Sequence, residues 1–246
     1  GSALELNAVL ASPVQDIQLT ASFSSSDQIT VARPVTIDGG VFTITSTNAA
    51  EDASASAGIL VTAGATLKNL TVSGPNNNPS GWDQGEYGIK IYDTAGVILE
   101  DVTVTGANAG IQVNSSEVTL AGTITVTGNE FGGIEVCKSS QLEKTGSLDI
   151  RSAKLVHADE SYSNPVLWVD GNEAGGTVTG AESLYAVAAS ESKTHYYVKN
   201  VIGESILAAG DYTYDDYTYH GRFSVELDGK TVTISFVVVD KQVLRQ

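Results

Sequence analysis

Gly88-Ile-Lys-Ile91, Gly110-Ile-Gln-Val113 and Gly133-Ile-Glu-Val136 are three copies of one short pattern, and their starts lie 22 and 23 residues apart. Two copies are each followed by an apolar-alternating run that ends in Thr-Val-Thr-Gly, at 103–106 and 125–128. A repeat of this length indicates stacked units that bury a core only together. Because each unit consists of short strands and turns without a helix, the sequence predicts an all-β parallel β-helix, or β-solenoid.

The repeat extends beyond these three copies in both directions. Gly58-Ile-Leu-Val61 opens an earlier unit, 30 residues before Gly88, and the surplus lies in 75–87. An insertion in a repeat protein protrudes on one face, which is often the binding face. Val166–Val169 opens a later unit and leaves room for a second loop near 153–164. Further alternating runs at 17–20, 29–31, 35–37 and 41–44 supply the first coils, so roughly six or seven coils are expected.

Both ends of the chain differ from the repeats. Leu4–Ala11 has apolar residues at helical spacing and stops before Pro13, which predicts a short capping helix over the first coil. After Leu184 the pattern changes, and Asp228-Gly229 between two alternating runs predicts a hairpin. We therefore expect a β-helix domain at 1–184 and a C-terminal β-rich cap or small module at 185–246.

Composition limits the classes of partner. The formal net charge of −16 argues against binding to nucleic acid, which needs basic patches against phosphate. The acidic surface is compatible with divalent cations, of which Ca²⁺ is the one cofactor considered, with neutral glycans, or with solubility alone. The single Cys137 excludes an internal disulfide, and no apolar run of about 18 residues is present to span a membrane.

Alternation within the repeated strand assigns its outward positions, because the Ile and Val of each copy must face the shared interior. One expected solvent-facing column contains Lys90, Gln112, Glu135 and Trp168, and the next contains Tyr92, Asn114, Cys137 and Asp170. The insertion adds Trp82, Asp83, Glu86 and Tyr87 beside them. Aromatic rings, amides and carboxylates suit carbohydrate recognition. We name these residues, without Cys137, the candidate strip. The alternative is that they are ordinary surface residues of the sheet, with Trp168 partly covered by the loop at 153–164.

Thr103 and Thr105, with Thr125 and Thr127, form a second outward array. Regular threonine ladders can bind ordered water surfaces. Threonine is also simply a good strand residue on an exposed face, and the sequence alone favours this plainer interpretation.

The sequence predicts no catalytic residue. Enzymes that cleave polysaccharides need closely placed carboxylates, whereas Glu135 and Asp170 are scattered among the repeats. His157, His195 and His220 lie outside the repeats, and none has a partner at metal-binding spacing. His157 is expected to be a surface residue.

Several segments together carry a family resemblance: 35–40, 96–106, 114–120 and 129–136. With them the chain resembles, over about residues 14–180, the pectate-lyase-like right-handed parallel β-helix domains of bacterial cell-surface and S-layer-associated proteins. Trp168-Val-Asp170 is similar to a pectate-lyase segment, but Gly171 stands where that family has His. The lyase and polygalacturonase signatures therefore cannot be carried over.

The resemblance implies a secreted or cell-surface, non-catalytic bacterial module that contacts polysaccharide or matrix, or that serves as a rigid spacer. Two alternatives remain open. One is a polysaccharide lyase or glycoside hydrolase that acts on an acidic polysaccharide. The other is a structural protein of a phage or virion surface.

Overall fold

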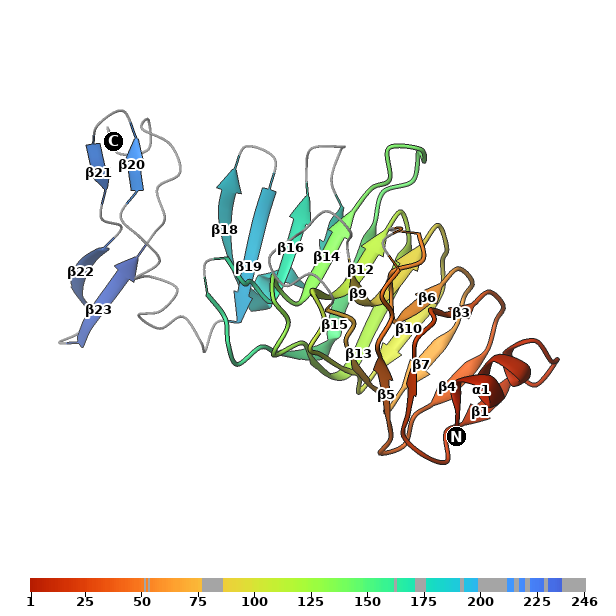
Figure 1. Ribbon diagram of the computed structural model, residues 1–246. Coiled ribbons are helices and arrows are strands. Elements are labelled where there is room, and N and C mark those ends of the chain that lie inside the picture. The colour runs from red at the N-terminus through yellow and green to blue at the C-terminus, as the bar shows by residue number, and fades with distance from the viewer. Residues whose placement is uncertain are drawn as a thin grey trace.

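The computed structural model describes residues 1–50, 52, 54–76, 86–161, 163–170, 176–190 and 193–198, together with four strands between 212 and 235. Among these residues β-strands predominate, and one α-helix lies at the N-terminus. Figure 1 shows the strands stacked side by side in chain order from the N-terminal helix onward. The all-β class predicted from the sequence is confirmed.

An eight-stranded sheet contains the repeated Gly-Ile-x-Val segments. Its parallel strands, in spatial order, are β3 (Ile29–Val31), β6 (Ile59–Val61), β9 (Tyr87–Tyr92), β12 (Ala109–Asn114), β14 (Ile134–Cys137) and β16 (Leu167–Asp170). Ile89, Ile111 and Ile134 are in register on neighbouring strands and fully buried. The predicted interior line of isoleucines is therefore confirmed.

An eleven-stranded parallel sheet curls around the same interior in two halves. One half contains β1 (Asp16–Gln18), β4 (Thr36–Asp38), β7 (Thr66–Lys68), β10 (Val97–Glu100), β15 (Ser147–Val156) and β17 (Thr177–Thr179). The other half contains β2 (Phe23–Ser25), β5 (Thr43–Ser46), β8 (Thr71–Ser73) and β11 (Thr103–Thr105). The long strand β13 (Glu117–Thr125) joins both halves, and β15, which pairs with β13 from Glu117 to Thr125, continues into the second half as well.

A residue with positive φ marks the bend between the halves in successive coils. Asn69 has φ 50° and Asp101 has φ 51°, and Gly122 takes this place within β13 with φ 64°. The Asp101 carboxylate accepts a hydrogen bond of 2.7 Å from the Thr123 N–H across the bend. A Cβ at position 122 would lie 2.3 Å from Asp101 Oδ1, so glycine leaves room for this carboxylate and adopts the positive φ without strain.

One continuous aliphatic core fills the space between the two sheets. Ile44, Val72 and Val104 occupy one register line of the eleven-stranded sheet and are fully buried. Burying such a side chain contributes about 1.5–3 kcal/mol. The ladder of identical contacts therefore fixes which face of each strand points outward.

The N-terminal end of the core is closed by α1 (Ala3–Leu10), as the sequence predicts. Leu6 and Leu10 are buried against the first coil. The Ser2 hydroxyl accepts a hydrogen bond from the Glu5 N–H at 3.1 Å, and the Arg33 guanidinium donates to the Leu10 carbonyl at 2.7 Å. These bonds satisfy groups that a helix end leaves without partners.

At the other end, the eight-stranded sheet changes from parallel to antiparallel pairing. After the short 3-10 helix η1 (Ala181–Ser183), β18 (Leu184–Ser190) and β19 (Lys193–Val198) form a hairpin, and β19 pairs with β16. The sheet thus continues beyond Leu184, where the sequence places the domain boundary, and the division into two domains stays a prediction.

The tail contains two antiparallel pairs: β20 (Tyr212–Tyr214) with β21 (Tyr217–Tyr219), and β22 (Arg222–Leu227) with β23 (Lys230–Ser235). The second pair confirms the hairpin predicted around Asp228-Gly229. No helix within the described residues has the length and apolar character needed to cross a membrane.

Candidate functional site

The strand register brings the repeated part of the candidate strip together. Lys90, Gln112, Glu135 and Trp168 lie on successive strands, as do Tyr92, Asn114 and Cys137. Asp170 ends β16 and pairs in register with Lys193 of β19. Of the insertion residues, Tyr87 begins β9 and Glu86 precedes it, whereas Trp82 and Asp83 lie outside the described residues.

Five strip residues are buried, although the sequence predicts that they face solvent. The exposed fractions are 8% for Gln112, 6% for Glu135 and 3% for Trp168, and Glu86 and Tyr87 are buried as well. One cause is visible at Gly132, where a Cβ would lie 2.7 Å from the Trp168 ring. The chain before β14 therefore packs directly on this indole. The expectation of solvent exposure is wrong for these residues, since chain outside the repeated strands covers them.

Glu135 is the centre of this covered region. Its carboxylate accepts hydrogen bonds from the Tyr87 hydroxyl, from Gln112 Nε2 at 2.7 Å and from Trp168 Nε1 at 3.3 Å. Hydrogen bonds to a charged group contribute about 1.5–3 kcal/mol each, and here they offset the cost of removing the carboxylate from water. Burial, followed by the charge of Glu135, raises the pKa of the Tyr87 hydroxyl well above its usual value.

Two further groups of potential reactivity lie beside Glu135. Burial lowers the pKa of the Lys90 ammonium, with nearby acidic groups acting against this effect. Burial, together with the charges of Glu135 and Asp170, raises the pKa of the Cys137 thiol far above its usual value. Since the thiolate is the nucleophilic form, this environment keeps Cys137 unreactive.

The strip residues that a ligand can reach are Lys90, Tyr92, Asn114 and Asp170, all half-buried. The Tyr92 hydroxyl lies 3.5 Å from Ser139 Oγ, and Asn114 Oδ1 accepts a hydrogen bond from the Ser115 hydroxyl at 3.2 Å. Lys193 Nζ lies 3.7 Å from an Asp170 carboxylate oxygen. The accessible chemistry is thus one phenol, one amide, the amine of Lys90 and a partly neutralised charge pair.

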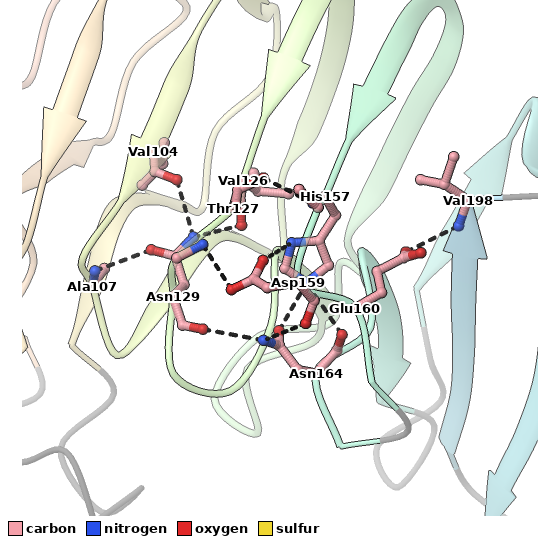
Figure 2. A network of polar contacts seen from close by, with 12 residues as sticks. Val104, Ala107, Val126, Thr127, Asn129, His157, Asp159, Glu160, Asn164 and Val198 are labelled. Carbon is pink, nitrogen blue, oxygen red and sulfur yellow. Dashed lines mark hydrogen bonds and ion pairs between the residues drawn. The ribbon is translucent and has the colours of Figure 1, made fainter. Parts of the chain in front are cut away.

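A second polar cluster, which the sequence analysis does not identify, links the turns of successive coils (Figure 2). His157 is only 1% exposed, so its expected place at the surface is wrong. Its Nδ1 lies 3.2 Å from Asp159 Oδ1, and its Nε2 lies 2.8 Å from Asn164 Oδ1. Both ring nitrogens therefore face polar groups of the same loop, which indicates a structural role.

Asn129 anchors the neighbouring turn in this cluster (Figure 2). Its amide nitrogen donates to the carbonyls of Val104 at 3.0 Å and Val126 at 2.8 Å, and its Oδ1 accepts from the Ala107 N–H at 3.0 Å. Asn164 Nδ2 in turn reaches the Asn129 carbonyl at 3.3 Å. The cluster thus fastens three successive coils through side-chain amides.

Glu160 connects the same loop to the C-terminal hairpin. Its carboxylate is 4% exposed and accepts a hydrogen bond of 2.9 Å from the Val198 N–H, at the end of β19. Burial raises the pKa of Glu160 to about 7, and the neighbouring charge of Asp159 acts in the same direction. No group of three His, Cys, Asp or Glu side chains in the described part of the chain is arranged to hold a metal ion.

Comparison of the chain with protein-family models, with curated proteins and with solved structures finds no significant match. The argument for function therefore rests on the geometry of this molecule.

Proposed function

We propose that the chain is a right-handed parallel β-helix that serves as a non-catalytic module of an exported bacterial surface protein, where it contacts carbohydrate or matrix or acts as a rigid spacer. The observation that carries this proposal is the unbroken parallel register from β3 to β16. Six strands at a spacing of about 4.8 Å form a stack about 24 Å long. Such a stack holds its two ends at a fixed separation.

The right-handed sense follows from a general rule of chain topology. The chain leaves the eight-stranded sheet at β9, passes through β10 and β11, and returns in parallel at β12. Crossovers between parallel strands of one sheet are right-handed in about 98% of cases. The same sense applied in every coil produces a right-handed helix of strands.

Contact with carbohydrate is proposed at the accessible part of the candidate strip. Tyr92 offers a ring face with a hydroxyl, and Asn114 offers an amide that can both donate and accept hydrogen bonds. Glu135, the central carboxylate, is already engaged by Tyr87, Gln112 and Trp168. This arrangement favours a binding or structural role over acid–base chemistry at Glu135.

The proposal is tested with a panel of neutral and acidic polysaccharides, followed for chain cleavage and for retardation in affinity electrophoresis. We expect no release of cleavage products from any polymer. Retardation that Tyr92→Ala removes, and that the exposed control Lys154→Ala leaves intact, assigns the contact to the strip. If no polymer retards the protein, carbohydrate contact is ruled out and the proposed role is that of a rigid spacer. Reproducible cleavage of any polymer would overturn the proposal as a whole.

A further inference from the structure

The outer surface of β2, β5, β8, β11 and the end of β13 carries a regular array of hydroxyl groups. Eight residues form two columns, which we call the hydroxyl face: Thr43, Thr71, Thr103 and Thr125 in one, and Ser24, Thr45, Ser73 and Thr105 in the other. The three central rows, on β5, β8 and β11, read Thr-aliphatic-Thr or a Ser variant of it, and β2 and β13 add one member each, Ser24 and Thr125.

Pairing in register makes this array periodic in two directions. Thr43, Thr71 and Thr103 are direct partners on successive strands, so neighbours in a column lie about 4.8 Å apart. Positions 43 and 45 of one row are two residues apart along an extended strand, or about 6.6 Å. The hydroxyl face is therefore a two-dimensional grid with a fixed unit.

The core holds the grid in place. Ile44, Val72 and Val104 lie between the two columns, point inward and are fully buried. Because side chains alternate along a strand, their neighbours on both sides must point outward. All eight members are half-buried or exposed.

The grid is polar but uncharged, and its hydroxyls are not used within the protein. Among the described residues, none of the eight side chains makes a hydrogen bond to another protein group. In the other half of the same sheet, Asp38, Lys68 and Glu100 lie in register on successive strands. A surface without charge is therefore a local property of this half, in a chain whose net charge is −16.

We propose that the hydroxyl face binds the surface of crystalline ice. Threonine and valine have nearly the same shape and both favour strands, yet every outward position from Ser24 to Thr125 in the two columns carries a hydroxyl. An ice surface presents oxygen atoms in rows that repeat on the same scale as this grid. A grid with a matching repeat can form hydrogen bonds to many lattice oxygens at once. Each hydrogen bond contributes little binding free energy, but many of them together contribute a large amount.

The alternative occupant, a neutral polysaccharide, fits this face less well. Sugar-binding surfaces rely on aromatic rings for stacking and on amides or carboxylates to hold hydroxyl pairs. The eight positions contain none of these groups. Single hydrogen bonds between these hydroxyls and a flexible polymer replace hydrogen bonds to water, so their net contribution to the binding free energy is small.

The test is ice-affinity partitioning, in which slowly grown ice is separated from the liquid and the protein in each phase is measured. We expect the protein to be enriched in the ice over an inert protein of similar size. The variant Thr71→Lys with Thr103→Lys places two charged chains at the centre of the grid and should lower the partition ratio by about tenfold or more.

The matched control is Thr36→Lys with Thr66→Lys, which changes two register partners of equal burial on the charged half of the same sheet. Both double variants should keep the circular dichroism spectrum and melting temperature of the parent. The proposal is supported if the control variant stays enriched in the ice while the Thr71→Lys, Thr103→Lys variant does not. Lack of enrichment of the parent chain, or equal losses in both double variants, overturns it. Absence of ice enrichment combined with Thr71-dependent binding to an insoluble neutral polysaccharide would reassign the face to that polymer.

Discussion

Replacing Glu160 by glutamine should remove the loss of stability that the protein undergoes as pH rises from about 4.5 to about 7. The carboxylate lies almost fully buried beside β19, and burial raises its pKa from 4.5 to about 7. Below pH 4.5, Glu160 is protonated in both the folded and the unfolded chain. Between 4.5 and 7 the unfolded chain has lost this proton while the folded chain retains it. Stability therefore falls as pH rises through this window and then stays level.

The size of the effect follows from the shift. Each pKa unit corresponds to 1.36 kcal/mol, so ionisation of Glu160 costs the folded state roughly 3 kcal/mol above pH 7. Glutamine keeps an oxygen that can accept the Val198 N–H bond of 2.9 Å but cannot ionise. Relative to the parent, Glu160→Gln should gain about 2–3 kcal/mol in unfolding free energy between pH 5 and pH 8.

Urea unfolding at pH 5 and pH 8 measures this difference, because all other titrating groups are common to both proteins and cancel. Glu130→Gln, at an exposed position in the neighbouring turn, is the control and should keep the parent's fall in stability between pH 5 and pH 8, because it retains Glu160. Hydrogen exchange at the Val198 amide should report the same dependence locally. A difference between Glu160→Gln and the parent that is equal at both pH values would refute the reasoning.

Three further predictions concern the covered region around Glu135. Glu135→Ala removes an acceptor that three buried donors share and should lower the unfolding free energy by about 3 kcal/mol or more in urea titrations, with Glu135→Gln losing less. Cys137 should not react with a thiol reagent at pH 8 in the folded protein and should react fully in denaturant, because its pKa is raised in the fold. Gly132→Ala brings a methyl group within 2.7 Å of the Trp168 ring at a backbone φ of 140°, and should both destabilise the protein by more than about 1 kcal/mol and shift the indole fluorescence. Unchanged fluorescence and stability in that variant would show that the turn does not pack on the ring as described.

The strand register could be predicted because it depends on a pattern contained in the chain itself. Ile89, Ile111 and Ile134 recur at nearly constant spacing, and only one alignment buries all three. That alignment also places Gln112 beside Glu135 without any further information. The repeat in the sequence thus determines the strand register, because both depend on burying the branched aliphatic side chains.

Burial of the outward columns could not be predicted in the same way. Alternation distinguishes the interior from the exterior of a coil, but it does not show whether other parts of the chain pass over the exterior. Gly132 packs on Trp168 from a turn outside the repeated strands. The available signal was Trp168 itself, since an indole is rarely left in water without a partner.

His157 illustrates a second limit. It follows Val156, which pairs with Thr125, so its place in the coil matches that of the buried Val126. Alternation therefore points His157 inward, but it does not show whether a polar side chain finds hydrogen-bond partners there. Asp159, two residues later, and Asn164 provide them.

The two outer surfaces of the stack therefore have different physical roles. Around Glu135, outward side chains are covered and bonded to one another, so they stabilise the module and leave little for a partner to contact. Around Thr71 and Thr103 the side chains are half-exposed, uncharged and repeated without interruption. A partner that binds by periodicity would use the second of these surfaces, because the repeat of the fold reaches solvent there as a repeated pattern of uncharged hydroxyl groups.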